Sequence, residues 1–318
     1  QIPVSGSFVN LSCPDGSGGA GRNKGKAGIF MELTAVTKML KDAEKGGYGV
    51  GSFSARNTFL IEYILRAAQE TKAPVIVQIS ANEFNWFDVT AEEFARRFYE
   101  IHEKYQGKAA LHLDHTKDME IIRAAIDAGF QSVMIDASQK SFEENVAITR
   151  EVVEYAHERN VEVEAELGKI GATDKIETDN DESLYTDPQE AEEFVARTGV
   201  DTLAVSIGTA HGVYPVKNPK IDLDRLIKIR ERVSIPLVLH GGSGLPAQTV
   251  QAAITIPGGG VSKINIATDL EQAFLGSLGC ARKSNREILQ MDRQALEKAG
   301  EAVSRVVEDK IRNFLLWK

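Results

Sequence analysis

The sequence predicts an α/β fold in which eight parallel strands close into a barrel and a helix follows each strand. Eight short apolar runs alternate with segments of helical length between residues 34 and 314. Parallel strands need long, usually helical crossovers, and eight strand–helix units in about 280 residues fit a closed barrel. Polar residues gather where the strands end, as active-site residues do in such barrels. We therefore predict a (β/α)8 TIM barrel with an extra N-terminal helix and long C-terminal helices; a doubly wound open sheet is the alternative.

The predicted strands are short apolar runs rich in Val, Ile and Leu, and a polar or small residue directly follows most of them. In chain order they are expected at residues 48–53, 74–79, 109–113, 132–135, 161–166, 202–207, 236–239 and 261–266. The fifth strand is followed by a long polar loop at 168–186.

The predicted helices fill the intervals between the strands. In chain order they are expected at residues 34–44, 58–70, 91–105, 119–128, 142–159, 188–198, 223–232, 247–254 and 269–314. The first precedes the first strand, and the last continues to the end of the barrel domain. Gly129 directly follows the helix at 119–128, where a C-cap glycine is expected.

The composition is that of an ordinary globular protein. Of 318 residues, 42% are apolar and 26% are charged, and the net charge is −9. No run of Lys and Arg exceeds two residues, which argues against nucleic-acid binding. Cys13 and Cys280 stand far apart, so we expect free thiols in a reducing compartment. No apolar run approaches the roughly 18 residues of a membrane span, and we expect a cytoplasmic protein.

Residues 1–30 differ from the rest of the chain. They contain seven glycines and show little periodicity. We expect a flexible leader or a segment left over from expression, with an ordered hairpin as the alternative, and a single barrel domain over residues 31–318.

Acidic and histidine side chains follow five consecutive predicted strands. They are Asp114 and His115 after the third strand, Asp136 after the fourth, Glu166 at the end of the fifth, His211 after the sixth and His240 after the seventh. Three imidazoles that meet at one mouth can bind Zn²⁺ and leave a fourth position open for substrate. A purely structural hydrogen-bond network is the alternative. His112 is expected in the core or behind the ligands.

Glycine-rich turns follow the sixth and seventh strands, at residues 208–212 and 240–246, and residues 265–269 at the end of the eighth strand open a helix. Such turns let backbone N–H groups converge on an anion, and the loops after strands seven and eight form the usual phosphate site of these barrels. Ser243 and Thr268 add hydroxyl groups there. Tight turns without a ligand are the alternative. A metal beside a phosphate site suggests a small phosphorylated carbonyl substrate. Lys263 is the only lysine inside a predicted strand, and we expect it to pair with acids of the mouth.

Together these motifs resemble the class II, zinc-dependent ketose-bisphosphate aldolases. The resemblance covers residue 31 to the C-terminus and is carried by residues 113–115, 166–168, 208–212, 239–244 and 263–269. It implies a lyase that reversibly cleaves fructose or tagatose 1,6-bisphosphate to dihydroxyacetone phosphate and glyceraldehyde 3-phosphate. Ala267 is similar to the tagatose-bisphosphate subgroup, because fructose-bisphosphate enzymes usually have Asp there.

The resemblance also implies roles for individual residues. His115, His211 and His240 would bind the catalytic Zn²⁺, and Asp114 would transfer the proton of the C4 hydroxyl. Asp136 and Glu166 would orient the ligands or hold zinc at a second site. The substrate-binding residues would be Ser80, Gly212, Gly241, Ser243, Asn265, Ala267 and Thr268. A monovalent cation, Na⁺ or K⁺, near the phosphate and a homodimer or homotetramer are usual in this family.

Three departures from the family pattern stand out. Asp174 falls where a loop glutamate usually removes the substrate proton, so we expect it to act as the catalytic base with a shorter side chain. Glu271 stands where a cationic residue usually meets the second phosphate, and a carboxylate there repels phosphate. Residues 257–260 lengthen the turn before the last strand.

Other functions remain open from the sequence. The chain could join dihydroxyacetone phosphate to a different or unphosphorylated aldehyde, or it could be a non-catalytic barrel subunit. A zinc hydrolase fits less well, because the first strand lacks the paired histidines that such barrels often carry.

Overall fold

A computed structural model of the protein describes residues 31–172, 184–212, 214 and 219–318. Its centre is a closed barrel of parallel strands. In chain order these are β2 (Val50–Ser54), β3 (Val75–Ser80), β4 (Gly107–Thr116), β5 (Ser132–Ile135), β6 (Glu162–Leu167), β8 (Thr202–Val205), β10 (Leu237–Leu239) and β11 (Val261–Ile266). Each pairs with the next, and β11 pairs with β2 to close the ring. The predicted (β/α)8 barrel is confirmed.

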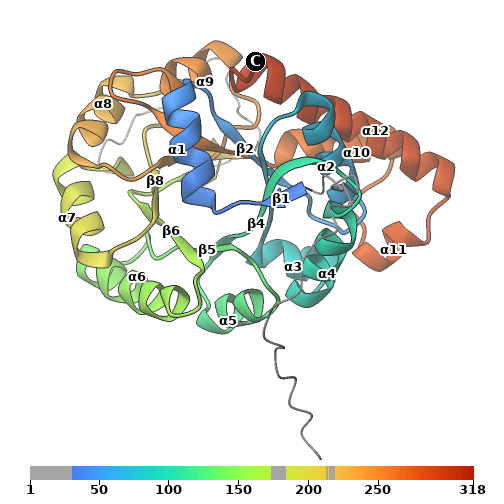
Figure 1. Ribbon diagram of the computed structural model, residues 1–318, viewed down its shortest axis with the longest axis horizontal. Coiled ribbons are helices and arrows are strands. Elements are labelled where there is room, and N and C mark those ends of the chain that lie inside the picture. The colour runs from blue at the N-terminus through green and yellow to red at the C-terminus, as the bar shows by residue number, and fades with distance from the viewer. Residues whose placement is uncertain (1–30, 173–183, 213, 215–218) are drawn as a thin grey trace, which may run out of the picture.

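A ring of helices surrounds the barrel (Figure 1). It consists of α2 (Leu60–Thr71), α4 (Ala91–His102), α5 (Met119–Asp127), α6 (Phe142–His157), α7 (Pro188–Thr198), α8 (Leu223–Arg232), α9 (Ala247–Ile254) and α10 (Thr268–Leu278). Local sequence sets several helix starts. Thr90 and Glu93 form a capping box at α4, and Ser141 and Glu144 form another at α6, so the first free N–H groups are paired.

The N-terminal end of the barrel is covered by α1 (Val36–Gly46), which lies in front in Figure 1. The apolar side of α1, including Met39 and Leu40, packs on Val50, Ile76 and Ala110, which begin or lie near the start of their strands. The predicted extra N-terminal helix is therefore confirmed. Helix α1 closes the end of the barrel where the strands begin. The opposite end, where the strands finish, is left open for the site.

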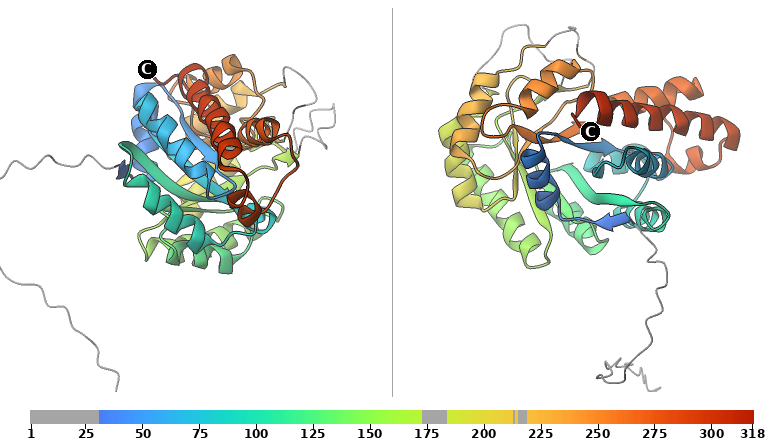
Figure 2. Two further views of the ribbon diagram at one scale, coloured as in Figure 1. Left: turned by 90° about the vertical axis from the view of Figure 1, so that its right-hand side faces the viewer. Right: turned by 45° about the horizontal axis from the view of Figure 1, so that its top comes forward.

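Several elements differ from the prediction. The prediction of helix throughout residues 269–314 was wrong. α10 ends where Gly279 caps it with a left-handed φ of +64°. It is followed by α11 (Asn285–Leu289), α12 (Arg293–Asp309) and the π-helix η3 (Lys310–Phe314). Figure 2 shows these helices extending to one side of the barrel, where α12 packs on α10 and α2.

Four short elements are additional to the predicted ones. They are β1 (Met31–Leu33), which pairs with the start of β4, α3 (Ala81–Phe87) and the small sheet of β7 (Gly171–Ala172) and β9 (Ala210–His211). Residues 1–30, with the expected leader and Cys13, lie outside the described residues, and Cys280 is a free thiol. Among the described residues, none of the helices combines the length and apolar character that a membrane crossing requires.

Candidate active site

The strand ends and the loops that follow them line one open cavity of about 850 Å³. The predicted site residues that line it are Ser80, Asp114, His115, Asp136, Glu166, His211, Gly212, Gly241, Ser243, Asn265, Ala267 and Thr268. His240 lies directly beneath and is fully buried. Asp174 is outside the described residues, so its position is not part of this geometry. Residues from seven strands or the loops that follow them thus share one mouth, as expected for the polar strand ends of a barrel.

Three imidazole rings converge at the floor of this cavity. The Nε2 atom of His115 lies 3.1 Å from Nε2 of His211 and 2.7 Å from Nδ1 of His240. Zn–N bonds of about 2.0–2.1 Å at tetrahedral angles place neighbouring ligand nitrogens about 3.3 Å apart. All three nitrogens lie within 4.8 Å of one another, so they are close enough to share one ion.

An irregularity in β4 brings Asp114 and His115 to the same cavity. Neighbouring residues of a regular strand point to opposite sides of the sheet. Here the pairing of β4 with β5 shifts register between Leu113 and Thr116, and His115 has a φ of +27°. Such a bulge re-aims a side chain, at a backbone cost of about 1–3 kcal/mol for a residue other than glycine. The strand thus presents an acid and an imidazole side by side.

The charges around the imidazoles favour a cation. Burial opposes protonation of His115, but the carboxylate of Asp114, the hydrogen bond with Asp136 and the carboxylate of Glu166 outweigh it and raise its pKa to about 9. Burial lowers the pKa of His211 to about 3, and the charge on His115 adds to this effect. Burial raises the pKa of Glu166 to about 8. One proton on His115 thus supplies positive charge at the point where the three rings meet.

The donor set fits a divalent metal. Within the described part of the chain, Asp114, Asp136 and Glu166 form no ion pair with Lys or Arg. The buried Oε2 of Glu166 has no hydrogen-bond partner among these residues and lies 3.5 Å from Nδ1 of His240. Asp136 Oδ2 accepts from Nδ1 of His115 at 3.3 Å, which leaves Nε2 of that ring free to bind a metal. A second donor group is formed by His115, Asp136 and Glu166.

Two amides hold the carboxylate of Asp114. Gln78 Nε2 donates to Oδ2 at 3.0 Å, and Asn265 Nδ2 donates to Oδ1 at 2.9 Å. Both amides are buried, so the acid has one fixed orientation beside His115. Gln78 was not among the predicted site residues, although its position near the end of a strand could have indicated it.

The loops after β8 and β10 approach each other closely where the anion site was predicted. Gly241 has a φ of +66°, and a Cβ atom there would lie 2.2 Å from the carbonyl oxygen of Ala210. Only glycine therefore allows this contact. The Tyr214 hydroxyl accepts from Ala210 N–H at 2.8 Å and donates to the Gly241 carbonyl at 2.9 Å, which ties the two loops together.

The start of α10 faces this pair of loops. The Ser243 hydroxyl accepts from the backbone N–H of Ala267 at 3.0 Å and of Asp269 at 3.3 Å. These are N–H groups at a helix N-terminus, which attract anions. The Ser243 hydroxyl thus pairs with two N–H groups at the start of α10, and both Ser243 and Thr268 line the cavity.

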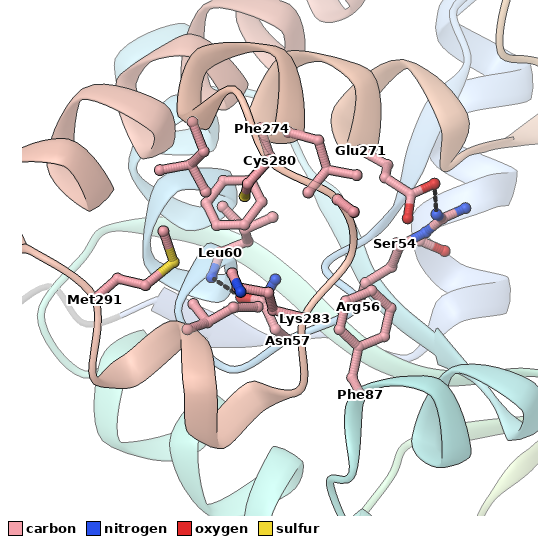
Figure 3. A pocket seen from close by; sticks show the side chains of 14 residues that line it. Ser54, Arg56, Asn57, Leu60, Phe87, Glu271, Phe274, Cys280, Lys283 and Met291 are labelled. Atoms are coloured by element: carbon pink, nitrogen blue, oxygen red, sulfur yellow. Dashed lines mark hydrogen bonds and ion pairs between the residues drawn. The ribbon is translucent and has the colours of Figure 1, made fainter.

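The structure changes the interpretation of Glu271. Its carboxylate pairs with the guanidinium of Arg56 and with Arg282 Nε at 2.7 Å, and these partners hold its pKa below the usual value although burial raises it. Figure 3 shows Glu271 and Arg56 turned toward each other beside a narrow apolar pocket. The acid is therefore not an isolated charge that repels phosphate, and the two arginines are rim residues that the sequence analysis missed.

His112 and Lys263 lie inside the barrel, below the cavity floor. His112 is fully buried and hydrogen-bonds with Ser132 Oγ at 2.9 Å, as expected for a core residue. Lys263 pairs with Glu164 at 2.7 Å. The expectation of an acidic partner is confirmed, but that partner lies within the barrel and not at its mouth.

Comparisons with known proteins agree with this geometry. The family model "Fructose-bisphosphate aldolase class-II" matches residues 34–316. A protein from Staphylococcus epidermidis named fructose-bisphosphate aldolase is 40% identical over 300 residues, which cover 89% of this chain and 98% of that protein.

Solved structures are similar as well. The crystal structure of the YdjI aldolase from Escherichia coli K12 is 33% identical with a TM-score of 0.75, and the match covers 89% of this chain and 97% of that one. A putative fructose-1,6-bisphosphate aldolase from Coccidioides immitis is 29% identical with a TM-score of 0.74, covering 88% and 96% of the two chains.

Proposed function

Because this chain belongs to the class-II fructose-bisphosphate aldolase family, we propose that its cavity cleaves a ketose 1,6-bisphosphate to dihydroxyacetone phosphate and glyceraldehyde 3-phosphate. The chain is a class II aldolase, a lyase that acts on a carbon–carbon bond. The observation that carries the proposal is the convergence of three imidazole nitrogens beside the loops after β8 and β10 and the N-terminus of α10.

Zn²⁺ is the metal that this site holds in our proposal. His115, His211 and His240 supply its ligands, and Asp136 and Glu166 form a second position next to them. When bound, the metal polarises the ketose carbonyl and acidifies the neighbouring C–H bond. Nitrogen donors with carboxylates nearby and an open side toward the cavity are the arrangement of a catalytic zinc site.

Asp114 handles the proton of the C4 hydroxyl as the C3–C4 bond breaks or forms. The amides of Gln78 and Asn265 hold its carboxylate, so the acid meets the substrate without reorienting. Asp174 would be the base that removes the C–H proton of dihydroxyacetone phosphate in condensation and returns that proton to the same carbon in cleavage. Its shorter side chain requires the loop that carries it to approach the substrate more closely than a glutamate would.

The phosphate of the dihydroxyacetone half binds between the loops after β8 and β10 and the start of α10. The residues that hold this half of the substrate are Ser80, Gly212, Gly241, Ser243, Asn265, Ala267 and Thr268. Helix N–H groups and hydroxyls neutralise the phosphate without a lysine. A monovalent cation, Na⁺ or K⁺, completes this site, as the family resemblance implies.

The aldehyde half meets the rim formed by Arg56, Glu271 and Arg282. The side chain of Arg282 is 40% exposed, so its guanidinium can reach a distal phosphate. Ala267 favours the tagatose over the fructose configuration. An unphosphorylated aldehyde is the second candidate, because each guanidinium of the rim already pairs with a carboxylate.

The family resemblance also leads us to propose a cytoplasmic homodimer or homotetramer, which light scattering of the purified chain can test. Activity is tested by incubating the protein with fructose and tagatose 1,6-bisphosphates and following triose phosphate release with and without a chelator. His211→Ala should abolish cleavage, whereas His157→Ala, a matched change at an exposed residue of α6, should not.

Two outcomes would change the assignment. Bound zinc without cleavage of any ketose phosphate would identify a non-catalytic barrel subunit. Chelator-sensitive condensation of dihydroxyacetone phosphate with glyceraldehyde, but not with its phosphate, would identify the unphosphorylated aldehyde as the second substrate.

A further inference from the structure

A hydrogen-bonded network of fully buried polar side chains lies beneath the three imidazoles, and the chemistry proposed above does not use this network. Glu164 on β6 and Lys263 on β11 come from strands on different sides of the barrel, and both have no exposed surface. Lys263 also contacts His112 on β4. Burying such charged groups is costly unless each one is paired, so their retention in the core calls for a reason.

Glu164 contacts His240, one of the predicted zinc ligands, at the ring nitrogen that does not face His115. Its Oε1 lies 2.8 Å from Nε2 of His240, while Nδ1 of that ring faces His115 Nε2 at 2.7 Å. A carboxylate only accepts hydrogen bonds, so the proton of His240 must be on Nε2. The lone pair of Nδ1 then points to the place where the three rings meet.

Lys263 sets the direction of the hydrogen bonds among these buried side chains. Its ammonium can only donate, and it donates to Glu164 Oε2 at 2.7 Å and to Nε2 of His112 at 3.2 Å. His112 must therefore carry its proton on Nδ1, where it donates to Ser132 Oγ at 2.9 Å. One fixed cation thus orients two histidines, one of them a ligand.

We propose that Glu164 and Lys263 are positioning residues that hold His240 as the Nε2–H tautomer, so that the metal meets an unprotonated Nδ1. Glu164 accepts the hydrogen bond of His240 Nε2–H through Oε1, and Lys263 fixes the carboxylate by donating to its other oxygen, Oε2. Carboxylates on the outer nitrogen of a metal-binding histidine fix the tautomer and strengthen the ligand. This inference rests on the proposed metal site.

The amide variant Glu164→Gln gives a direct test. The ammonium of Lys263 would attract the amide oxygen, so the amide N–H₂ group would face His240. The ring would then switch to the Nδ1–H tautomer, whose proton occupies the metal position. We expect the Kd for Zn²⁺, measured on the full chain by competition with a chromophoric chelator, to rise about 10–100-fold.

The double variant E164Q/K263M separates orientation from simple damage. Without the ammonium the amide can turn its oxygen toward His240, so the double variant should bind Zn²⁺ more tightly than E164Q alone. If the pair served only to stabilise the core, the second change would not recover affinity. Glu162→Gln is the matched control on the same strand; Glu162 accepts hydrogen bonds from Thr37 on α1, away from the site, and its variant should match the wild type.

The tautomers can be read without any metal. Nitrogen-15 spectra of histidine-labelled, metal-free protein should show His240 as Nε2–H in the wild type and the double variant, and as Nδ1–H in E164Q. An unchanged tautomer with unchanged Zn²⁺ affinity in E164Q would overturn the inference. Should the wild type bind no Zn²⁺, the proposed metal site fails, while the same spectra still decide whether Glu164 and Lys263 control the tautomer.

Discussion

Removal of the Asp114 carboxylate should separate catalysis from metal binding. A positioned acid–base group contributes roughly 10²- to 10⁴-fold to the rate, or about 2.7–5.4 kcal/mol of transition-state stabilisation at 1.36 kcal/mol per decade. Asp114 is only 5% exposed, so water cannot easily take its place. We therefore expect Asp114→Ala to lower kcat by about 10²- to 10⁴-fold.

The same change should leave the metal in place. Asp114 does not belong to the group formed by His115, His211 and His240. Loss of a neighbouring polar group typically costs about 10–100-fold in metal affinity, which a saturating zinc concentration overcomes. The two amides that donate to Asp114 lose an acceptor, so the free energy of unfolding should fall by about 1–3 kcal/mol, a loss that need not unfold the barrel.

The assay is triose phosphate release at saturating zinc, with bound zinc measured on the same sample. Asp127→Ala is the matched control, because Asp127 is an exposed residue at the far end of α5. A kcat of the Asp114 variant within tenfold of the wild type would refute the proton-transfer role. Loss of zinc at saturating concentration would show that Asp114 is a ligand or a structural residue of the metal site.

Three further predictions follow from the geometry. His211→Ala should weaken zinc binding more than 100-fold, because a three-nitrogen site loses one ligand, whereas His157→Ala should leave the Kd unchanged in a chelator competition. Glu271→Gln should lower KM for a ketose bisphosphate relative to the corresponding 1-phosphate, because the variant weakens the ion pairs that hold the guanidinium groups of Arg56 and Arg282. Equal KM values for the wild type and the variant would exclude this role of the rim. Gly300→Ala should lower the free energy of unfolding by about 1–3 kcal/mol, because the added Cβ would lie 2.2 Å from an aromatic ring of α2. Gly276→Ala on α10 should raise the free energy of unfolding by up to about 1 kcal/mol, because the added Cβ has no neighbour within 4 Å. Urea titrations at fixed zinc measure both changes.

The barrel could be predicted because every strand is a short apolar run and every crossover is helical. The missed helix α3 had a readable signal, since Ser80 and Glu83 form a capping box directly after β3. The short strand β1 offered no such signal, because its three residues gain their pairing from β4 alone. The break at Gly279 could have been expected from a glycine within a helical pattern.

The position of a candidate site residue could be predicted where its place on its own strand decides where its side chain lies. His115, His211 and His240 follow strands, and the topology then brings them together. Glu164 could not be recognised in this way, because its contact with Lys263 crosses the barrel interior, and sequence gives no register across that space. The rim arginines depend on loop paths, which strand patterns do not determine.

The bulge in β4 has a consequence for how such a protein can diverge. Asp114 and His115, the proposed proton-handling acid and a proposed metal ligand, are joined by a single peptide link, so the separation of their Cα atoms is fixed by covalent geometry and not by loop packing. The phosphate and aldehyde contacts, by contrast, come from separate loops that can lengthen or change composition independently. Substitutions there can alter which sugar is accepted while the bond-breaking centre stays as it is.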